Sequence, residues 1–218
     1  MLLITPTQAE YRAVEAALRD LLAAGRPELI MFGMGPDCAS TLCRQLEARA
    51  RLPEALALLG VAGGLDPELA AGDAVIASTA LDAAGRQAPC TLIGLSGAVI
   101  GPMLTVSRAL YTPAEKAAGR DTGALAVEME AYPLAAWASE RGLPFVHARV
   151  ILDPVDEALP DLGDVLDEWG RVRPVGLLRR LLAHPSHAAA MVRLQRRSRT
   201  IAPALGRLAQ ALVTAHRI

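Results

Sequence analysis

Acidic residues stand directly after apolar runs in the stretch from Leu125 to Pro154. Glu128 and Glu130 follow a short apolar run, and Asp153 follows the longer run Phe145–Leu152. Burial at the end of an apolar strand raises the pKa of a carboxyl group towards the range that suits a general acid. The pattern therefore predicts acid–base chemistry on a small molecule.

The elements that carry these acids read as strand, helix, strand. An alanine-rich amphipathic segment, Ala131 to Arg141, is closed by Gly142 and separates the two apolar runs. A βαβ unit with a crossover helix is the interpretation we adopt. Parallel strands of such a unit end at one edge of a sheet, so the acids would face one cleft. Pro154 restricts Asp153 to an extended backbone.

The preceding residues continue the alternation of strand and helix. Glu10 lies in the first turn of a predicted helix, where its charge suits the helix dipole. Three glycines in the segment Gly60–Leu65 follow a third buried strand and would let a ligand approach the backbone. Predicted strands lie at residues 1–5, 28–33, 55–59, 73–80 and 99–107.

The C-terminal part of the chain differs in charge. Residues 171–218 contain ten arginines and no acidic residue, so they carry +10 while the other 170 residues carry −11. Apolar residues from Leu194 to Leu212 recur at helical spacing, and Pro203 is expected to kink or split that helix. Helical patterns also cover residues 162–169 and 175–182. We expect one domain, 1–218, with a basic helical extension at 171–218.

Composition and motif spacing exclude several classes of site. The three cysteines include no CxxC pair, which argues against a zinc site or a disulfide framework. Lys116 is the only lysine, and no Walker-type phosphate loop is present. The segment Gly33-Met34-Gly35 begins a dinucleotide fingerprint, but Cys38 occupies the third glycine position. An NAD-binding Rossmann oxidoreductase is therefore a less favoured alternative.

The chain is expected to be cytoplasmic. Its apolar runs are shorter than a membrane span, and the N-terminal residues lack a basic leader and a cleavage site. We expect no metal, no organic cofactor and no nucleic-acid partner.

Four motifs together resemble the nucleoside phosphorylase and nucleosidase superfamily. They are Glu10 after a first strand, GVAGGLDPELAAGD at 60–73, VEME at 127–130 and LDPVD at 152–156, in that order. The TPAEK segment at 112–116, the TGALAVEME context and the arginine-rich tail are most similar to the hopanoid-associated phosphorylases. The superfamily resemblance covers roughly residues 1–165, and the subgroup resemblance nearly the whole chain.

This resemblance implies a three-layer α/β phosphorylase/hydrolase-like fold. The central sheet would be mixed and partly barrel-like, with a helical C-terminal segment. The implied reaction is cleavage of the N-glycosidic bond of a purine nucleoside, with adenine as the expected base and a 5′ substituent. In the subgroup the expected substrate is adenosylhopane. Phosphate or water would be the co-substrate, and the protein would be a homo-oligomer.

Site residues also follow from the resemblance. Asp153 is expected to be the general acid at the purine N7, and Glu130 to hold the ribose hydroxyls. Glu10 corresponds to the glutamate that positions water. Further expected substrate-binding residues are Met129, Glu128, Ala62 and Gly63.

Three alternatives stay open at this level. Leu152 stands where superfamily members commonly carry a serine, so a degenerate relative that binds nucleosides or membranes without turnover is one alternative. The anionic Glu10 favours hydrolysis, whereas the subgroup name favours phosphorolysis. The basic tail either contacts an anionic bilayer at the inner membrane face or packs its apolar stripe on the core.

Overall fold

The structure of the protein is a computed structural model that describes residues 1–25, 27–161, 163, 165–183 and 187–215. The strands are β1 (Leu2–Thr5), β2 (Glu28–Met31), β3 (Leu56–Gly64), β4 (Ala74–Asp82), β5 (Gln87–Pro89), β6 (Ala98–Thr105), β7 (Ala126–Glu128) and β8 (Phe145–Asp153). The helices are α1 (Gln8–Ala17), α2 (Arg19–Ala23), α3 (Pro36–Glu47), α4 (Pro113–Arg120), α5 (Ala131–Glu140), α6 (Pro174–Ala183) and α7 (His187–Ala215).

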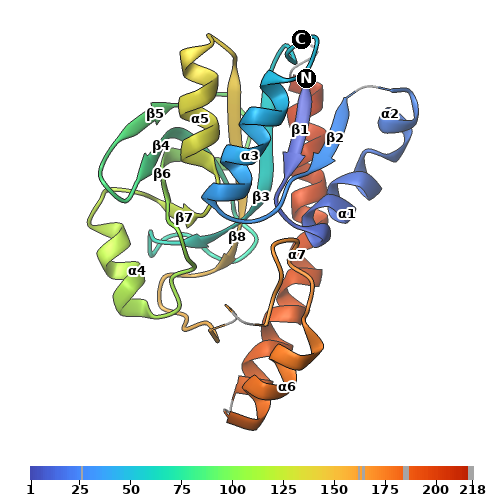
Figure 1. The fold of residues 1–218 in the computed structure, drawn as a ribbon. Coiled ribbons are helices and arrows are strands. Elements are labelled where there is room, and N and C mark those ends of the chain that lie inside the picture. The colour runs from blue at the N-terminus through green and yellow to red at the C-terminus, as the bar shows by residue number, and fades with distance from the viewer. Residues whose placement is uncertain (26, 162, 164, 184–186, 216–218) are drawn as a thin grey trace.

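In the part of the chain that the structure describes, eight strands form one mixed sheet at the centre of the molecule (Figure 1). Strand β3 pairs in parallel with β1 and β8 and antiparallel with β7. Because β8 also pairs with β4, β4 with β6 and β6 with β7, these strands close a ring that begins and ends at β3. The predicted α/β fold with a mixed, partly barrel-like sheet is confirmed.

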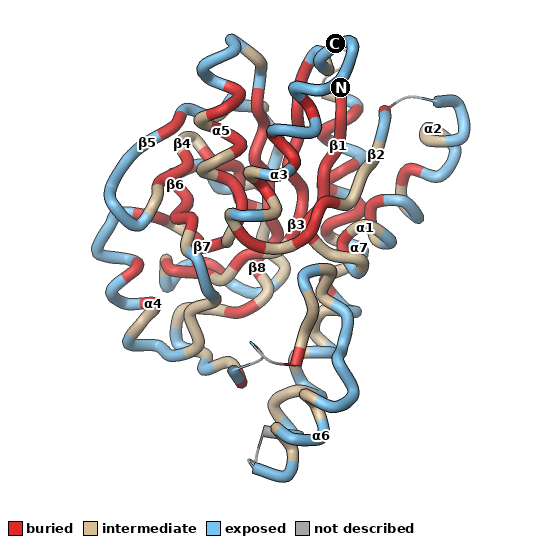
Figure 2. Tube along the Cα trace, viewed as in Figure 1, coloured by how far each residue is buried: buried red, intermediate tan, exposed pale blue. Residues whose placement is uncertain are grey.

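Helices cover both faces of the sheet, which gives three layers. Alternate residues of a strand point to opposite faces. Leu2 and Leu56 accordingly pack with α3 and α5, whereas Leu3 and Ala57 pack with α1 and α7. Figure 2 shows the buried segments concentrated in the strands and in the inner faces of these helices.

The predicted βαβ unit around α5 is wrong in one respect. Strand β7 runs antiparallel to β8, because β3 pairs antiparallel with β7 and parallel with β8. The three residues of β7 instead extend the parallel pairing of β6. Helix α5 therefore connects two strands, β7 and β8, that run in opposite directions.

The glycine-rich segment after residue 59 belongs to β3 itself and is not a separate loop. Strand β3 continues to Gly64, where Gly63 pairs with Val127 and Gly64 with Ala126. The glycines of this strand leave space for side chains of other elements, such as Arg149 and Glu10 beside Gly60.

The C-terminal helices divide into a packed part and a projecting part. Residues Ile201, Leu205, Leu208 and Leu212 of α7 are buried against the sheet, whereas α6 has no buried residue. In Figure 1, α6 and the first half of α7 extend away from the sheet. Helix α7 continues through Pro203 as one helix, so of the predicted kink or split, the split does not occur.

The predicted helix at 162–169 is not formed by its described residues. Leu166 instead makes an isolated antiparallel bridge with Val172. Leu162 lies outside the described residues.

Candidate active site

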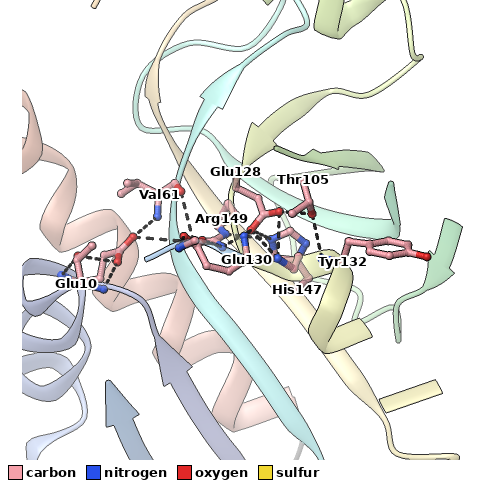
Figure 3. Close-up of polar contacts among 11 residues, drawn as sticks. Glu10, Val61, Thr105, Glu128, Glu130, Tyr132, His147 and Arg149 are labelled. Atoms are coloured by element: carbon pink, nitrogen blue, oxygen red, sulfur yellow. Dashed lines mark hydrogen bonds and ion pairs between the residues drawn. The ribbon is translucent and has the colours of Figure 1, made fainter. Parts of the chain in front are cut away.

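A buried guanidinium group joins two acids at the end of β7. Arg149 on β8 places its Nη2 atom 2.6 Å from Glu128 Oε2 and 2.9 Å from Glu130 Oε2 (Figure 3). Glu130 Oε1 also accepts a hydrogen bond from the backbone N–H of Gly35, at 2.9 Å. Arg149 Nε donates to His147 Nε2 at 3.0 Å. The Arg149 guanidinium thus sets the position of both glutamates.

Glu10 approaches the same guanidinium from α1. Its Oε2 atom closes a capping box with Thr7, and its Oε1 atom accepts from the backbone N–H of Val61 at 2.7 Å. Oε1 lies 3.9 Å from Arg149 Nη1. The capping box fixes the Glu10 side chain at the start of α1. Glu10 therefore caps the helix with one carboxyl oxygen and faces Arg149 with the other.

Burial and charge separate the pKa values of the two glutamates. Burial raises the pKa of Glu130 to about 7, against the opposing effect of Arg149 and with a contribution from Glu128. For Glu128, the effect of burial is outweighed by the charge of Arg149 and by a hydrogen bond from Thr105, which hold its pKa below the usual value. Burial lowers the pKa of His147 to about 3. Glu128 is therefore the permanent anion, and Glu130 can gain or lose a proton near neutral pH.

Asp153 lies at the end of β8, beside Gly63. The register of β8 shifts at this point, since Ala62 pairs with Ile151 and Gly63 with Asp153. Leu152 is thus the extra residue of a β-bulge, a device that redirects side chains near active sites. A Cβ atom on Gly63 would lie 3.3 Å from Asp153 Oδ2, so glycine allows this close approach.

Lys116 of α4 meets the Asp153 carboxyl group. Its Nζ atom lies 2.5 Å from Asp153 Oδ2, and both side chains are buried. Burial raises the pKa of Asp153, and Lys116 acts in the opposite direction. The site thus has two parts. Asp153 is a buried carboxyl group beside Lys116, and Glu10, Glu128 and Glu130 form a cluster around Arg149.

The sequence profile of the phosphorylase superfamily matches residues 5–97 and 93–176. The chain belongs to the phosphorylase superfamily. Enzymes of this superfamily cleave N-glycosyl bonds, and the predicted enzyme class is confirmed. Among the curated proteins, none matches the chain.

Solved structures of this superfamily share the fold. The 5′-methylthioadenosine/S-adenosylhomocysteine nucleosidase of Helicobacter pylori superposes with a TM-score of 0.68 at 13% identity, over 98% of this chain and 97% of the other. The corresponding Neisseria meningitidis nucleosidase has a TM-score of 0.66 at 17% identity, over 98% of each chain. Futalosine hydrolase of Helicobacter pylori has a TM-score of 0.59 at 12% identity, over 94% and 95%.

Superfamily membership removes the Rossmann alternative. Gly33 and Gly35 have φ values of 101° and 90° and form the turn from β2 into α3, with Gly35 as the N-cap. The backbone N–H of Gly35 binds the Glu130 carboxylate. The Gly33-Met34-Gly35 segment is therefore a turn whose backbone supports Glu130, and it is not a dinucleotide-binding loop.

The remaining predicted site residues lie around this cluster. Ala62 is buried beside Ile151, and Met129 is half-buried, 4.0 Å from the place of a Cβ on Gly35. Asp153 has no direct contact with the Arg149 cluster among the described residues. The two parts are related through β3, because Gly63 pairs with Asp153 on one side and with Val127 on the other.

Little of this site reaches the surface. Asp153 is 3% exposed and Glu130 4%. The backbone around Trp169 crosses this end of the sheet, where the carbonyl groups of Glu168 and Trp169 accept from Met34 and Gln8. A surface hollow of about 520 Å³ lies elsewhere, bounded by α1, α2 and the start of β2, and contains none of the four carboxyl groups. The acids are the candidate site because buried carboxyl groups can perform acid–base chemistry.

Sequence reasoning missed Arg149, His147 and Lys116 as site residues. A usable signal was present in β8, where His147 and Arg149 alternate with Val146, Ala148 and Val150. Those three apolar residues pack towards α7, so the two basic residues point to the other face. No local signal links Lys116 to Asp153.

Proposed function

We propose that the protein hydrolyses the N-glycosidic bond of a purine nucleoside, with Asp153 as general acid and Glu130 holding the ribose. The pairing of Gly63 with both Asp153 and Val127 carries the proposal. Neighbouring strands lie about 4.8 Å apart, so these two partners of Gly63 are roughly 10 Å apart. A nucleoside spans such a distance with its base near Asp153 and its ribose near the turn after Val127.

The base end requires a proton donor. A purine anion is a poor leaving group, so a ring nitrogen has to gain a proton as the bond to the sugar breaks. The O–H bond of Asp153 breaks, the N7–H bond forms, and the electrons of the glycosidic bond pass to the purine. Burial supports this role because it raises the Asp153 pKa and keeps a protonated fraction available.

The sugar end requires negative charge. The ribosyl ring gains oxocarbenium character as the glycosidic bond stretches. Three carboxyl groups, Glu10, Glu128 and Glu130, surround the single guanidinium of Arg149, so a deprotonated cluster is anionic. Ionised Glu130 accepts hydrogen bonds from the ribose hydroxyls and favours the cationic transition state.

Charge also favours water over phosphate as the nucleophile. A phosphate dianion needs cationic groups and free backbone donors. Arg149 is already bound to the glutamates, and Arg108, the other basic candidate, is paired with Glu115 at 2.6 Å. Water is neutral and is not repelled by the anionic cluster. The oxygen of a water molecule close to Glu10 bonds to C1′ of the ribosyl cation, and its proton passes to the Glu10 carboxylate.

Product analysis tests the reaction. We expect the purified protein to release base from purine nucleosides equally with and without phosphate, and to yield free ribose. Asp153→Asn should lower the rate about 10²- to 10⁴-fold, while Asp156→Asn, at an exposed acid nearby, should not. Base release that depends on phosphate would overturn hydrolysis. Equal inactivity of wild type and Asp153→Asn on the whole panel would favour a binding protein without turnover.

Within this class we favour an adenine nucleoside with a 5′ substituent. Several structural neighbours are named for 5′-methylthioadenosine and S-adenosylhomocysteine, which are 5′-substituted adenine nucleosides. The resemblance to hopanoid-associated phosphorylases points to adenosylhopane, whose 5′ substituent is a membrane lipid. Comparing base release from adenosine with that from 5′-alkyl analogues of increasing length tests this preference.

We further propose that α6 and the first half of α7 contact an anionic bilayer. Val175, Leu178 and Leu182 share one stripe of α6 and are 71%, 61% and 74% exposed. Exposed arginines of α7 (193, 196 and 199) accompany this apolar stripe. An apolar stripe with flanking cations fits the interfacial region of an anionic membrane.

The membrane contact would be peripheral. Among the described helices, none combines the length and the apolar character that crossing a bilayer requires. We place the enzyme in the cytoplasm, at the inner membrane face. We also propose homo-oligomeric assembly, which the exposed apolar residues Leu92, in the β5–β6 connection, and Val99 and Ile100, in β6, support.

A further inference from the structure

Lys116 is a fully buried lysine, and it is the only lysine in the chain. Its Nζ atom donates to the backbone carbonyl oxygens of Pro154 and Glu157, at 2.6 and 2.8 Å. It also lies 2.5 Å from Asp153 Oδ2. All three oxygen atoms belong to the segment that begins with the proposed general acid.

The contact with Asp153 is an ion pair more than a directed hydrogen bond. Among the described residues, Oδ2 has no hydrogen-bond partner of acceptable geometry, although Nζ lies against it. The two carbonyl oxygens hold the ammonium group in place, and the ammonium group faces the carboxyl group. The carboxyl group therefore keeps hydrogen-bonding capacity for a ligand.

Burying an ammonium group is costly unless partners compensate for the lost water. Lys116 sits in α4, whose N-terminal capping box fixes the helix start at Thr112. The residue before Asp153, Leu152, has no hydroxyl group and packs with the apolar cluster against α7. Support for the Asp153 side chain thus comes from α4 and not from the adjacent residue.

We propose that Lys116 is the positioning residue of Asp153. This inference rests on the proposed function, in which Asp153 protonates the purine. Lys116 holds Oδ2 so that the other carboxyl oxygen is directed to the base. When the Asp153 O–H bond breaks and the purine N7–H bond forms, the carboxylate left behind is stabilised by the ammonium group.

The charge of Lys116 also balances the effect of burial on the acid. Burial raises the Asp153 pKa, whereas an adjacent cation lowers it. The Asp153 pKa is therefore set by two opposing effects, burial that raises it and the Lys116 charge that lowers it. Removing the cation should leave an acid that is both misplaced and too weak.

The test compares Lys116→Met, which keeps the length without the charge, with Lys116→Arg, which keeps the charge. A carbon-13 NMR titration follows the Asp153 carboxyl carbon, assigned by its loss in Asp153→Asn. We expect Lys116→Met to raise the Asp153 pKa by about 1–3 units. Lys116→Arg should keep it near the wild-type value. Arg120→Met, an exposed cation-to-methionine change on the same helix, should have no effect.

Kinetics supply the second readout. In Lys116→Met, kcat should fall about 100-fold with a smaller change in KM, and the alkaline limb of the kcat/KM profile should move to higher pH. Lys116→Arg should recover part of kcat. If Lys116→Met fails to fold, the Lys116→Arg titration and profile decide, since a changed Asp153 pKa there would overturn the charge argument.

Two results separate the inference from the proposed function. An unchanged Asp153 titration and pH profile in folded Lys116→Met would overturn the positioning role even if the wild type cleaves nucleosides. A wild type that releases no base would overturn the proposed function and with it the catalytic role of Lys116. The NMR titration would then still measure the pairing of Lys116 with Asp153.

Discussion

A Cβ atom on Gly60 would lie 2.2 Å from Nη1 of Arg149 and 2.5 Å from Oε1 of Glu10. The guanidinium and the carboxylate therefore occupy the space that a side chain at position 60 would need. This close approach explains why a glycine stands in the middle of a regular strand.

Gly60→Ala should disrupt the acid cluster. Because the Cβ would displace both buried charged groups, we expect the free energy of unfolding to fall by about 1–3 kcal/mol or more. Base release should fall with it. Urea unfolding gives the measurement. Gly94→Ala is the matched control, since a Cβ there meets nothing within 4 Å, and it should change stability little. A Gly60→Ala protein with wild-type stability and activity would contradict the packing described.

Glu130 should give stability a specific pH dependence. Its pKa is about 7 in the folded protein and 4.5 ordinarily. Between these values the unfolded chain has lost a proton that the folded protein keeps, so stability falls as pH rises from about 4.5 to 7. Glu130→Gln should remove this part of the dependence, on the order of 1–3 kcal/mol. Urea unfolding of both proteins at about pH 5 and pH 7 measures it.

Glu128 provides the contrast of opposite sign. Its pKa is lowered in the folded protein, so it contributes stability above about pH 4.5 that is lost as pH falls through its folded pKa. Glu128→Gln should therefore be most destabilising near neutral pH. The same pH trend in both glutamine variants would show that the two carboxyl groups are not distinguished as described.

The two parts of the C-terminal region should differ in their contribution to stability. Leu208 of α7 is 5% exposed, whereas Leu178 of α6 is 61% exposed. Leu208→Ala should lower the free energy of unfolding by about 2–5 kcal/mol, because it leaves a cavity in the core. Leu178→Ala should change it by less than about 0.5 kcal/mol. Comparable losses in thermal or urea unfolding would mean that α6 is packed and not exposed.

Anionic vesicles should bind the exposed part of the same region. We expect wild-type protein to sediment with anionic vesicles and not with zwitterionic ones, and added salt should weaken binding. Charge reversal at Arg193, Arg196 and Arg199 should abolish sedimentation.

A control variant with equal charge change separates local from overall charge. Reversal of Arg12, Arg19 and Arg120, which are exposed on other helices, should preserve vesicle binding. Equal loss in both triple variants, or equal negligible binding by all proteins, would remove the membrane proposal.

Local patterns in the sequence determined most of the elements. Apolar runs located β1, β8 and the first part of β3. The ordered motifs around Glu10, Glu130 and Asp153 indicated the superfamily. These features depend on neighbouring residues, so they can be read without a structure.

The tertiary structure alone decided how the acids are supported. The antiparallel direction of β7, the bulge at Leu152 and the pairing of Lys116 with Asp153 arise from contacts between distant segments. The same holds for Arg149, which joins glutamates from another element. Strand pairing and buried charge pairs are set by the packing of the whole sheet, because each partner is stable only when the other is buried with it. The sequence therefore identified the acids, and the tertiary structure brought Arg149 of β8 and Lys116 of α4 into contact with them.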